Sequence, residues 1–175
     1  MNTMPATKVI DIFLMPGDVF VGDEQYRVRT LLGSCVSVTL WHPLLRIGAM
    51  SHFQLPGYGR RRAHSQPGIY GADAMELMCD GLAQHGVPLM QCQGKIFGGG
   101  AMFPGNSNAP DIGAQNGDFA RDCLREHGIP LVSESLFGVG HRQLIFTIRT
   151  GEVLSRQVAP ELALVGGKQT KKGRL

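Results

Sequence analysis

Cys35 and His52 are the two residues of the sequence whose types best suit acyl-transfer chemistry, and His52 follows Cys35 by 17 positions. A cysteine thiolate is a strong nucleophile, and a neighbouring imidazole can take the thiol proton and later return it to a leaving group. Such an imidazole would also lower the pKa of the thiol, which is ordinarily about 8.5. The two residues therefore raise the hypothesis of a cysteine nucleophile served by a histidine base.

The segments around these residues predict how they meet. Residues 36–41 and 46–55 have the pattern of strands, and residues 42–45 have the pattern of a turn, so we expect an antiparallel hairpin. In the register that this turn sets, Cys35 lies directly across from His52, with Cβ atoms ~4.5–5.5 Å apart. The alternation along both strands places the pair on the face opposite the apolar one, outside the core.

Gly33 and Ser34 precede Cys35 and interrupt the strand pattern. Glycine permits a sharp turn that lifts a side chain out of a strand, and free backbone N–H groups at such a turn can receive a developing oxyanion. The spacing alone leaves two interpretations open, a catalytic Cys–His pair and a buried structural thiol. We assign the remaining thiols, Cys79, Cys92 and Cys123, to the core.

The other elements follow from periodicity and turn residues. The methionine stripe of the first helix suits core packing better than a cofactor pocket. His85 and His127 lie at the C-terminal ends of the two predicted helices, where an imidazole interacts favourably with the helix dipole. This interaction explains the two histidines better than a catalytic role does. We expect further strands at 9–15, 26–32, 93–97, 131–136, 143–149 and 152–158, and helices at 72–85 and 113–127.

Length and charge limit the domain organisation and the function classes. The chain has 175 residues and a mass of 18.9 kDa, so we expect one domain over residues 1–165. The formal net charge of +3 comes from the basic segment 166–175, which we expect to be disordered. On the body only Arg60-Arg61-Arg62 with His64 offers the basic face of a nucleic-acid binder, and such a run is more often a solvated loop. No apolar run approaches a membrane span, so neither partner is expected.

Cofactor and compartment follow from the cysteines and the N-terminus. The four cysteines form no CxxC pair, so no metal site is expected. No secretion signal is evident, so we expect a cytoplasmic protein with reduced thiols.

With these residues in place, the sequence resembles the CheD family of chemotaxis proteins, which deamidate glutamines of chemoreceptors. The specific part is the Leu-Gly-Ser-Cys-Val run with a histidine beyond its cysteine. Two segments depart from the family pattern, Trp41-His42 and Gly140-His141-Arg142, and we interpret both as surface or turn changes. The matching segments are Met15-Pro16-Gly17-Asp18, Thr30–Val36, Gly48–His52, Leu55-Pro56, Lys95–Met102, Ile112-Gly113, Asn116, Arg142, Phe146 and Thr150-Gly151.

The resemblance implies an activity and roles for named residues. Cys35 would be the nucleophile, His52 the general base and acid, and Thr30 the residue that orients the imidazole. Gly33 and Ser34 would form the oxyanion turn, and the turn Gly98-Gly99-Gly100, together with loop 57–68, would border the substrate. The implied enzyme is a hydrolase of side-chain amides, a protein-glutamine glutaminase that needs no cofactor and acts in chemotactic adaptation.

The resemblance also implies a fold, partners and a rival function. We expect an α/β (α+β) layered sandwich of mainly antiparallel sheet with helices packed outside, similar to cytotoxic necrotizing factor deamidase domains. The expected partners are the cytoplasmic helices of chemoreceptors and a CheC-type phosphatase, and methylesterase activity on the same receptors is a natural second reaction. The alternative is a non-catalytic binding module that regulates a CheC-type phosphatase or receptors. A reactive Cys35 with a lowered pKa would favour the enzyme.

Overall fold

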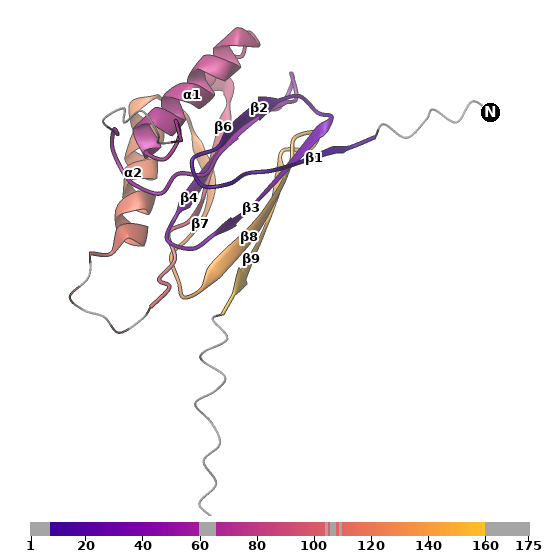
Figure 1. Ribbon diagram of the computed structural model, residues 1–175. Coiled ribbons are helices and arrows are strands. Elements are labelled where there is room, and N and C mark those ends of the chain that lie inside the picture. Colours follow the sequence, from indigo (N-terminus) through magenta and orange to yellow (C-terminus); the bar gives the residue numbers. More distant parts are fainter. Residues whose placement is uncertain (1–7, 60–65, 104, 106–107, 109, 160–175) are drawn as a thin grey trace, which may run out of the picture.

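The computed structural model describes residues 8–59, 66–103, 105, 108 and 110–159 (Figure 1). The predicted tail 166–175 and Arg60, Arg61 and Arg62 of the predicted substrate-bordering loop lie outside these residues. The elements are β1 (Ile10–Phe13), β2 (Val19–Gly22), β3 (Tyr26–Leu32), β4 (Val36–His42), β5 (Ile47–Ser51), α1 (Gly71–Gln84), the short 3-10 helix Leu89–Gln91, β6 (Gln93–Gly98), α2 (Ile112–Glu126), β7 (Leu131–Leu136), β8 (His141–Thr147) and β9 (Glu152–Val158).

Two sheets and one layer of helices make up the fold. One sheet has the strand order β1-β3-β8-β9 and the other the order β2-β5-β4-β6-β7. Pairing is antiparallel throughout, except for the parallel pairs β1–β3 and β6–β7. Both helices lie on one side of the five-stranded sheet, as Figure 1 shows. The predicted α+β sandwich of mainly antiparallel sheet with helices outside is confirmed; its likeness to cytotoxic necrotizing factor domains stays a prediction.

Two apolar clusters hold the three layers together. The first lies between the five-stranded sheet and the helices and includes Val36, Val38, Leu40, Met78 and Leu124. The second lies between the two sheets and combines residues such as Leu32 and Phe146 with Met50 and Phe97. Strand β4 is buried along nearly its whole length because it contributes to both clusters.

The β4–β5 hairpin has a different register from the predicted one. His42 pairs with Ile47, so the loop consists of residues 43–46. Arg46 adopts a left-handed conformation with φ 50°, and the Leu45 N–H donates to His42 Nδ1 over 3.1 Å. The side chain of His42 thus takes part in closing the loop and moves the turn one position along each strand. Val36 consequently pairs with Phe53, and Cys35 does not lie across from His52.

The chain crosses from one sheet to the other within three residues. Strand β3 belongs to the four-stranded sheet and β4 to the five-stranded sheet, and residues 33–35 connect them. The predicted sharp turn is therefore the link between two layers, and Cys35 lies at the end of the second cluster. The face that carries Cys35 is the inner face of the sandwich, which corrects the expectation that it lies outside the core.

Some predicted elements are confirmed and others were missed. The limits of β3, β7 and β9 agree with the prediction, and both helices agree to within a residue at each end. Strand β2 was missed because it is short and directly follows the Pro16-Gly17 turn. Of the two interpretations of Trp41-His42, the structure agrees with a turn change, because His42 Nδ1 accepts from the loop residue Leu45. A surface change is wrong, since His42 is buried and Trp41 Nε1 donates to the Ile148 carbonyl over 2.7 Å. No helix among the described residues is long and apolar enough to span a membrane.

Gly98 allows a test of how tightly the crossover is packed. It has φ +111°, and a Cβ there would collide with the carbonyl oxygen of Cys35. We expect Gly98→Ala to destabilise the fold by about 2–5 kcal/mol, from left-handed strain plus overpacking. Gly86→Ala is the matched control, because Gly86 has φ +69° but open space around it; it should lose only about 1–2 kcal/mol. Urea unfolding measures both, and equal losses would contradict the proposed clash.

Candidate active site at the sheet crossover

A chain of hydrogen bonds joins the two sheets at His52. Thr30 Oγ1 lies 2.8 Å from His52 Nδ1 and donates to the carbonyl oxygen of Leu14 over 2.8 Å. Thr30 belongs to β3, and His52 directly follows β5 in the other sheet. Both side chains are buried, with 3% and 2% of their surface exposed. The predicted pairing of Thr30 with His52 is therefore present in the structure.

The hydrogen bonds determine which imidazole nitrogen carries the proton. A threonine hydroxyl has one proton, and here that proton bonds to the Leu14 carbonyl. In its contact with His52 Nδ1 the hydroxyl must then accept, so Nδ1 carries the ring proton. The other ring nitrogen, Nε2, is left as a free acceptor, and it is buried without a hydrogen-bond partner among the described residues. An imidazole held in this tautomer is prepared to act as a base.

The backbone of His52 is fixed as well. Its N–H donates to the Asp18 carbonyl over 3.1 Å, and its carbonyl accepts from the Gly17 N–H over 2.7 Å. The Asp18 carboxylate in turn accepts from the Met15 N–H over 2.8 Å. Sequence analysis assigned no role to this turn, although the Pro-Gly-Asp run is a recognisable turn signal.

The protonation state of His52 follows from its surroundings. Burial lowers the pKa of the imidazole from 6.5 to about 4, while the Leu14 carbonyl and the negative charge of Asp18 act in the opposite direction. The imidazole is therefore neutral near pH 7. A neutral ring can accept a proton, which is what a general base requires.

Cys35 is half-buried, and burial raises the pKa of its thiol, although its own backbone N–H acts in the opposite direction. This contradicts the expectation that the neighbouring imidazole lowers the thiol pKa. The resting pair is a neutral thiol and a neutral imidazole.

The corrected register makes Cys35 and His52 diagonal neighbours. Val36 pairs with Phe53, so His52 lies across from Ser37, two positions from Cys35 and on the same face. Diagonal neighbours have Cα atoms ~7–8 Å apart, within reach of long side chains. The structure contains no hydrogen bond from the thiol to Nε2. Catalytic hydrogen bonds are often longer in the free enzyme than in its complexes.

The turn that carries Cys35 consists of Gly33, Ser34 and Cys35, and the backbone carbonyl of each accepts a hydrogen bond. The Gly33 carbonyl accepts from the Gly100 N–H and the Cys35 carbonyl from the Gly99 N–H, each over 2.9 Å. The Ser34 carbonyl accepts from the side-chain amide of Asn116 over 3.0 Å. Gly98, Gly99 and Gly100 are buried, and Gly99 and Gly100 support the turn of Cys35 through these hydrogen bonds. That the three glycines border the substrate stays a prediction.

The N–H groups of Ser34 and Cys35 donate to no backbone carbonyl among the described residues. In a trans peptide the N–H points opposite to the carbonyl of the preceding residue. Because the Gly33 and Ser34 carbonyls are both held, the directions of these two N–H groups are fixed. A pair of fixed, free N–H groups beside a thiol can stabilise an oxyanion.

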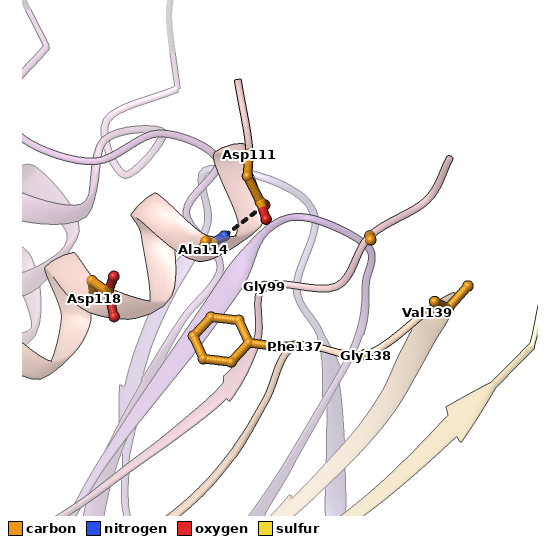
Figure 2. A pocket seen from close by; sticks show the side chains of 8 residues that line it. Gly99, Asp111, Ala114, Asp118, Phe137, Gly138 and Val139 are labelled. Atoms are coloured by element: carbon orange, nitrogen blue, oxygen red, sulfur yellow. Dashed lines mark hydrogen bonds between the residues drawn. The ribbon is translucent and has the colours of Figure 1, made fainter. Parts of the chain in front are cut away.

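Two open hollows flank the glycine turn. One has a volume of about 440 Å³ and is lined by Ser34, Gly100, Met102, Phe103, Pro110 and Ile112 among others. The second, of about 430 Å³, is drawn in Figure 2, where the Phe137 ring points toward α2 and the Asp111 side chain turns back to accept from the Ala114 N–H. The lining of the first hollow includes Ser34, the residue before Cys35, but not Cys35 itself.

The family model "CheD chemotactic sensory transduction" matches residues 54–157, which is more than half of the chain. A protein of Albidiferax ferrireducens, named probable chemoreceptor glutamine deamidase CheD 2, is 56% identical over 87% of this chain and 90% of its own length. The chain belongs to the CheD family.

A second CheD relative is less similar to this chain. This protein from Pseudomonas savastanoi pv. phaseolicola, named probable chemoreceptor glutamine deamidase CheD, is 39% identical over 92% of both chains.

Among solved structures, the Bacillus licheniformis hypothetical protein YfiH matches with a TM-score of 0.44 and 13% identity, covering 73% of this chain and 60% of that one. The CheD family match begins at residue 54, so the assignment of Cys35 and His52 as site residues rests on the geometry described above and stays a prediction.

The lowered pKa of His52 predicts a pH dependence of stability. Between pH 6.5 and about 4 the unfolded chain binds a proton that the folded chain excludes, so stability falls as the pH falls through this window. At pH 5 this group alone should destabilise the fold by about 2 kcal/mol relative to pH 7. Urea unfolding at both pH values should show the loss in the wild type and a smaller one in His52→Asn. Equal losses in the two proteins would contradict the lowered pKa.

Proposed function

We propose that this protein hydrolyses the side-chain amide of specific chemoreceptor glutamines, with Cys35 as nucleophile. Membership of the CheD family, whose matched relatives are named chemoreceptor glutamine deamidases, supports the reaction class and the substrate. The observation that carries the catalytic assignment is the free Nε2 of His52, which the Thr30 hydrogen bond leaves unprotonated on the face of Cys35.

The proposed reaction has two stages. The thiol of Cys35 gives its proton to His52 Nε2 while its sulfur forms a bond to the amide carbon, and the oxyanion is held by the Ser34 and Cys35 N–H groups. His52 returns the proton to the amide nitrogen, which leaves as ammonia. A water then gives a proton to His52 and attacks the thioester, and the sulfur leaves as the thiol, so the glutamine becomes a glutamate.

The partners and the second reaction belong to the same proposal. The same thioester would form from a glutamate methyl ester, with methanol leaving in place of ammonia, so we propose methylesterase activity as the side reaction. The substrates would be the cytoplasmic helices of chemoreceptors, and a CheC-type phosphatase is the proposed regulatory partner. Under the alternative function, a non-catalytic binding module, neither Cys35 nor His52 is needed.

Removal of the nucleophile tests the enzyme against the binding module. We expect Cys35→Ala to lower the rate of receptor deamidation about a thousand-fold or more, because no other group can form the thioester. The measurement is ammonia release from purified receptor cytoplasmic fragments, together with peptide masses that locate each converted glutamine. Cys79→Ala, which removes a half-buried thiol outside the site, should keep the wild-type rate. Conversion that persists in Cys35→Ala would eliminate the proposed nucleophile.

Thr30→Val tests the orientation of the base. The substitution preserves the shape of the side chain and removes the oxygen between His52 Nδ1 and the Leu14 carbonyl. We expect kcat to fall about ten- to a hundred-fold, since an imidazole of undefined tautomer is a poorer base. Thr39→Val is the control, because Thr39 is equally buried but lies in β4 of the other sheet, where no hydrogen bond joins it to His52. The same loss of kcat in both variants would indicate a general effect on folding rather than a role for Thr30.

A further inference from the structure

Asn116 occupies a position where a polar residue is energetically unfavourable. It lies in the interior of α2 and is fully buried. Its side-chain oxygen is buried without a hydrogen-bond partner among the described residues. An apolar residue would avoid this unsatisfied acceptor, so the amide must contribute something that packing does not.

The amide nitrogen of Asn116 joins two segments that no longer pair with each other. It donates to the Ser34 carbonyl over 3.0 Å and to the Gln54 carbonyl over 2.8 Å. The two strands are paired at Val36 and Phe53, but beyond that pair the Gln54 and Leu55 N–H groups both donate to Ile69. Asn116 therefore connects the segment of Cys35 with the segment of His52 at the point where the backbone hydrogen bonds between the two strands end.

The N-terminal end of α2 lies close enough to the crossover for this bridge because of Gly113. A Cβ at Gly113 would meet the backbone of Gly99 and Gly100, so the helix backbone packs directly on the glycine turn. Both hydrogen-bond partners of Asn116 are carbonyl oxygens, which accept only, so it must be the amide nitrogen that faces them.

We propose that Asn116 is a positioning residue that sets the direction of the Cys35 N–H as an oxyanion donor. The Ser34 carbonyl and the Cys35 N–H belong to one peptide plane and point in opposite directions. Fixing the carbonyl on the α2 side therefore fixes the N–H on the side of the thiol. Without Asn116 the Gly33 carbonyl is still held by Gly100, but the Ser34–Cys35 peptide can rotate. This role depends on one part of the proposed function, namely that Cys35 acts by acyl transfer.

Two small reagents separate this role from thiolate formation, without any receptor. p-Nitrophenyl acetate acylates a thiolate through an oxyanion, with the S–C bond forming first and p-nitrophenolate leaving afterwards. Iodoacetamide alkylates the same thiolate at a saturated carbon as iodide leaves, and no oxyanion forms. Rates are measured for both reagents at one mildly alkaline pH and corrected with Cys35→Ala, which shows the contribution of the other thiols.

We expect Asn116→Ala to slow acylation of Cys35 at least about ten-fold, as loss of an oxyanion donor does, and to leave alkylation within about three-fold of wild type. Asn116→Asp should lose acylation at least as strongly, because its carboxylate repels the two carbonyls. Leu124→Ala is the matched control, because Leu124 is buried on the same helix. This variant should have a lower melting temperature but the wild-type ratio of the acylation rate to the alkylation rate.

An unchanged acylation rate in folded Asn116→Ala, or acylation and alkylation falling together, would overturn the proposal. If Asn116→Ala does not fold, Asn116→Ser takes its place, because serine keeps a shorter hydrogen-bond donor. Its ratio of acylation to alkylation rates should be intermediate, and a wild-type ratio would also overturn the proposal. The proposed function fails separately, if the wild type reacts with both reagents but converts no receptor glutamine.

Discussion

A single hydroxyl proton determines the chemistry available at this site. Thr30 donates it to the Leu14 carbonyl, so the imidazole of His52 must donate to the Thr30 oxygen and carries no proton on Nε2. Burial then keeps the ring neutral, because the charged form would lose its hydration. If Thr30 instead donated to His52, Nε2 would carry the proton and could not act as a base.

The three-layer fold explains why such a proton arrangement can persist. Thr30 belongs to one sheet, His52 directly follows a strand of the other, and both side chains are buried. Water that could compete for the Thr30 proton is largely excluded there. The thiol lies on the link between the sheets and is only half-buried, so a substrate can reach it while the base stays protected. The proposed base is therefore buried, whereas the proposed nucleophile is partly exposed.

The crossover turn has a second consequence for catalysis. Its carbonyls are held by the glycine turn and by α2, and its N–H groups are left free. Elements far apart in the sequence thereby fix a donor pair that the turn could not fix alone. This arrangement favours stabilisation of a developing charge over a lowered thiol pKa, since burial raises the pKa of Cys35. The raised pKa by itself does not favour the binding module, because a general base can remove the proton during attack.

The sequence determined the residue types of the site and most of the elements that carry them. Apolar periodicity located both helices, and the turn residues between strand-like segments located β3, β7 and β9. Side-chain alternation correctly placed Cys35 and His52 on the same face. The register was wrong by two positions, and the pair stayed on one face because a shift of two preserves alternation.

Only the tertiary structure decided the protonation of His52 and the direction of the turn. The register error arose because a buried His42 closes the hairpin loop, an effect that turn propensities do not contain. The roles of Leu14, Asp18 and Asn116 depend on backbone carbonyls and N–H groups brought together from distant segments, and side-chain patterns carry no information about those contacts. Sequence could name Cys35 and His52 as the proposed nucleophile and base, but the pKa of each depends on burial between two sheets, which exists only once the layers have packed.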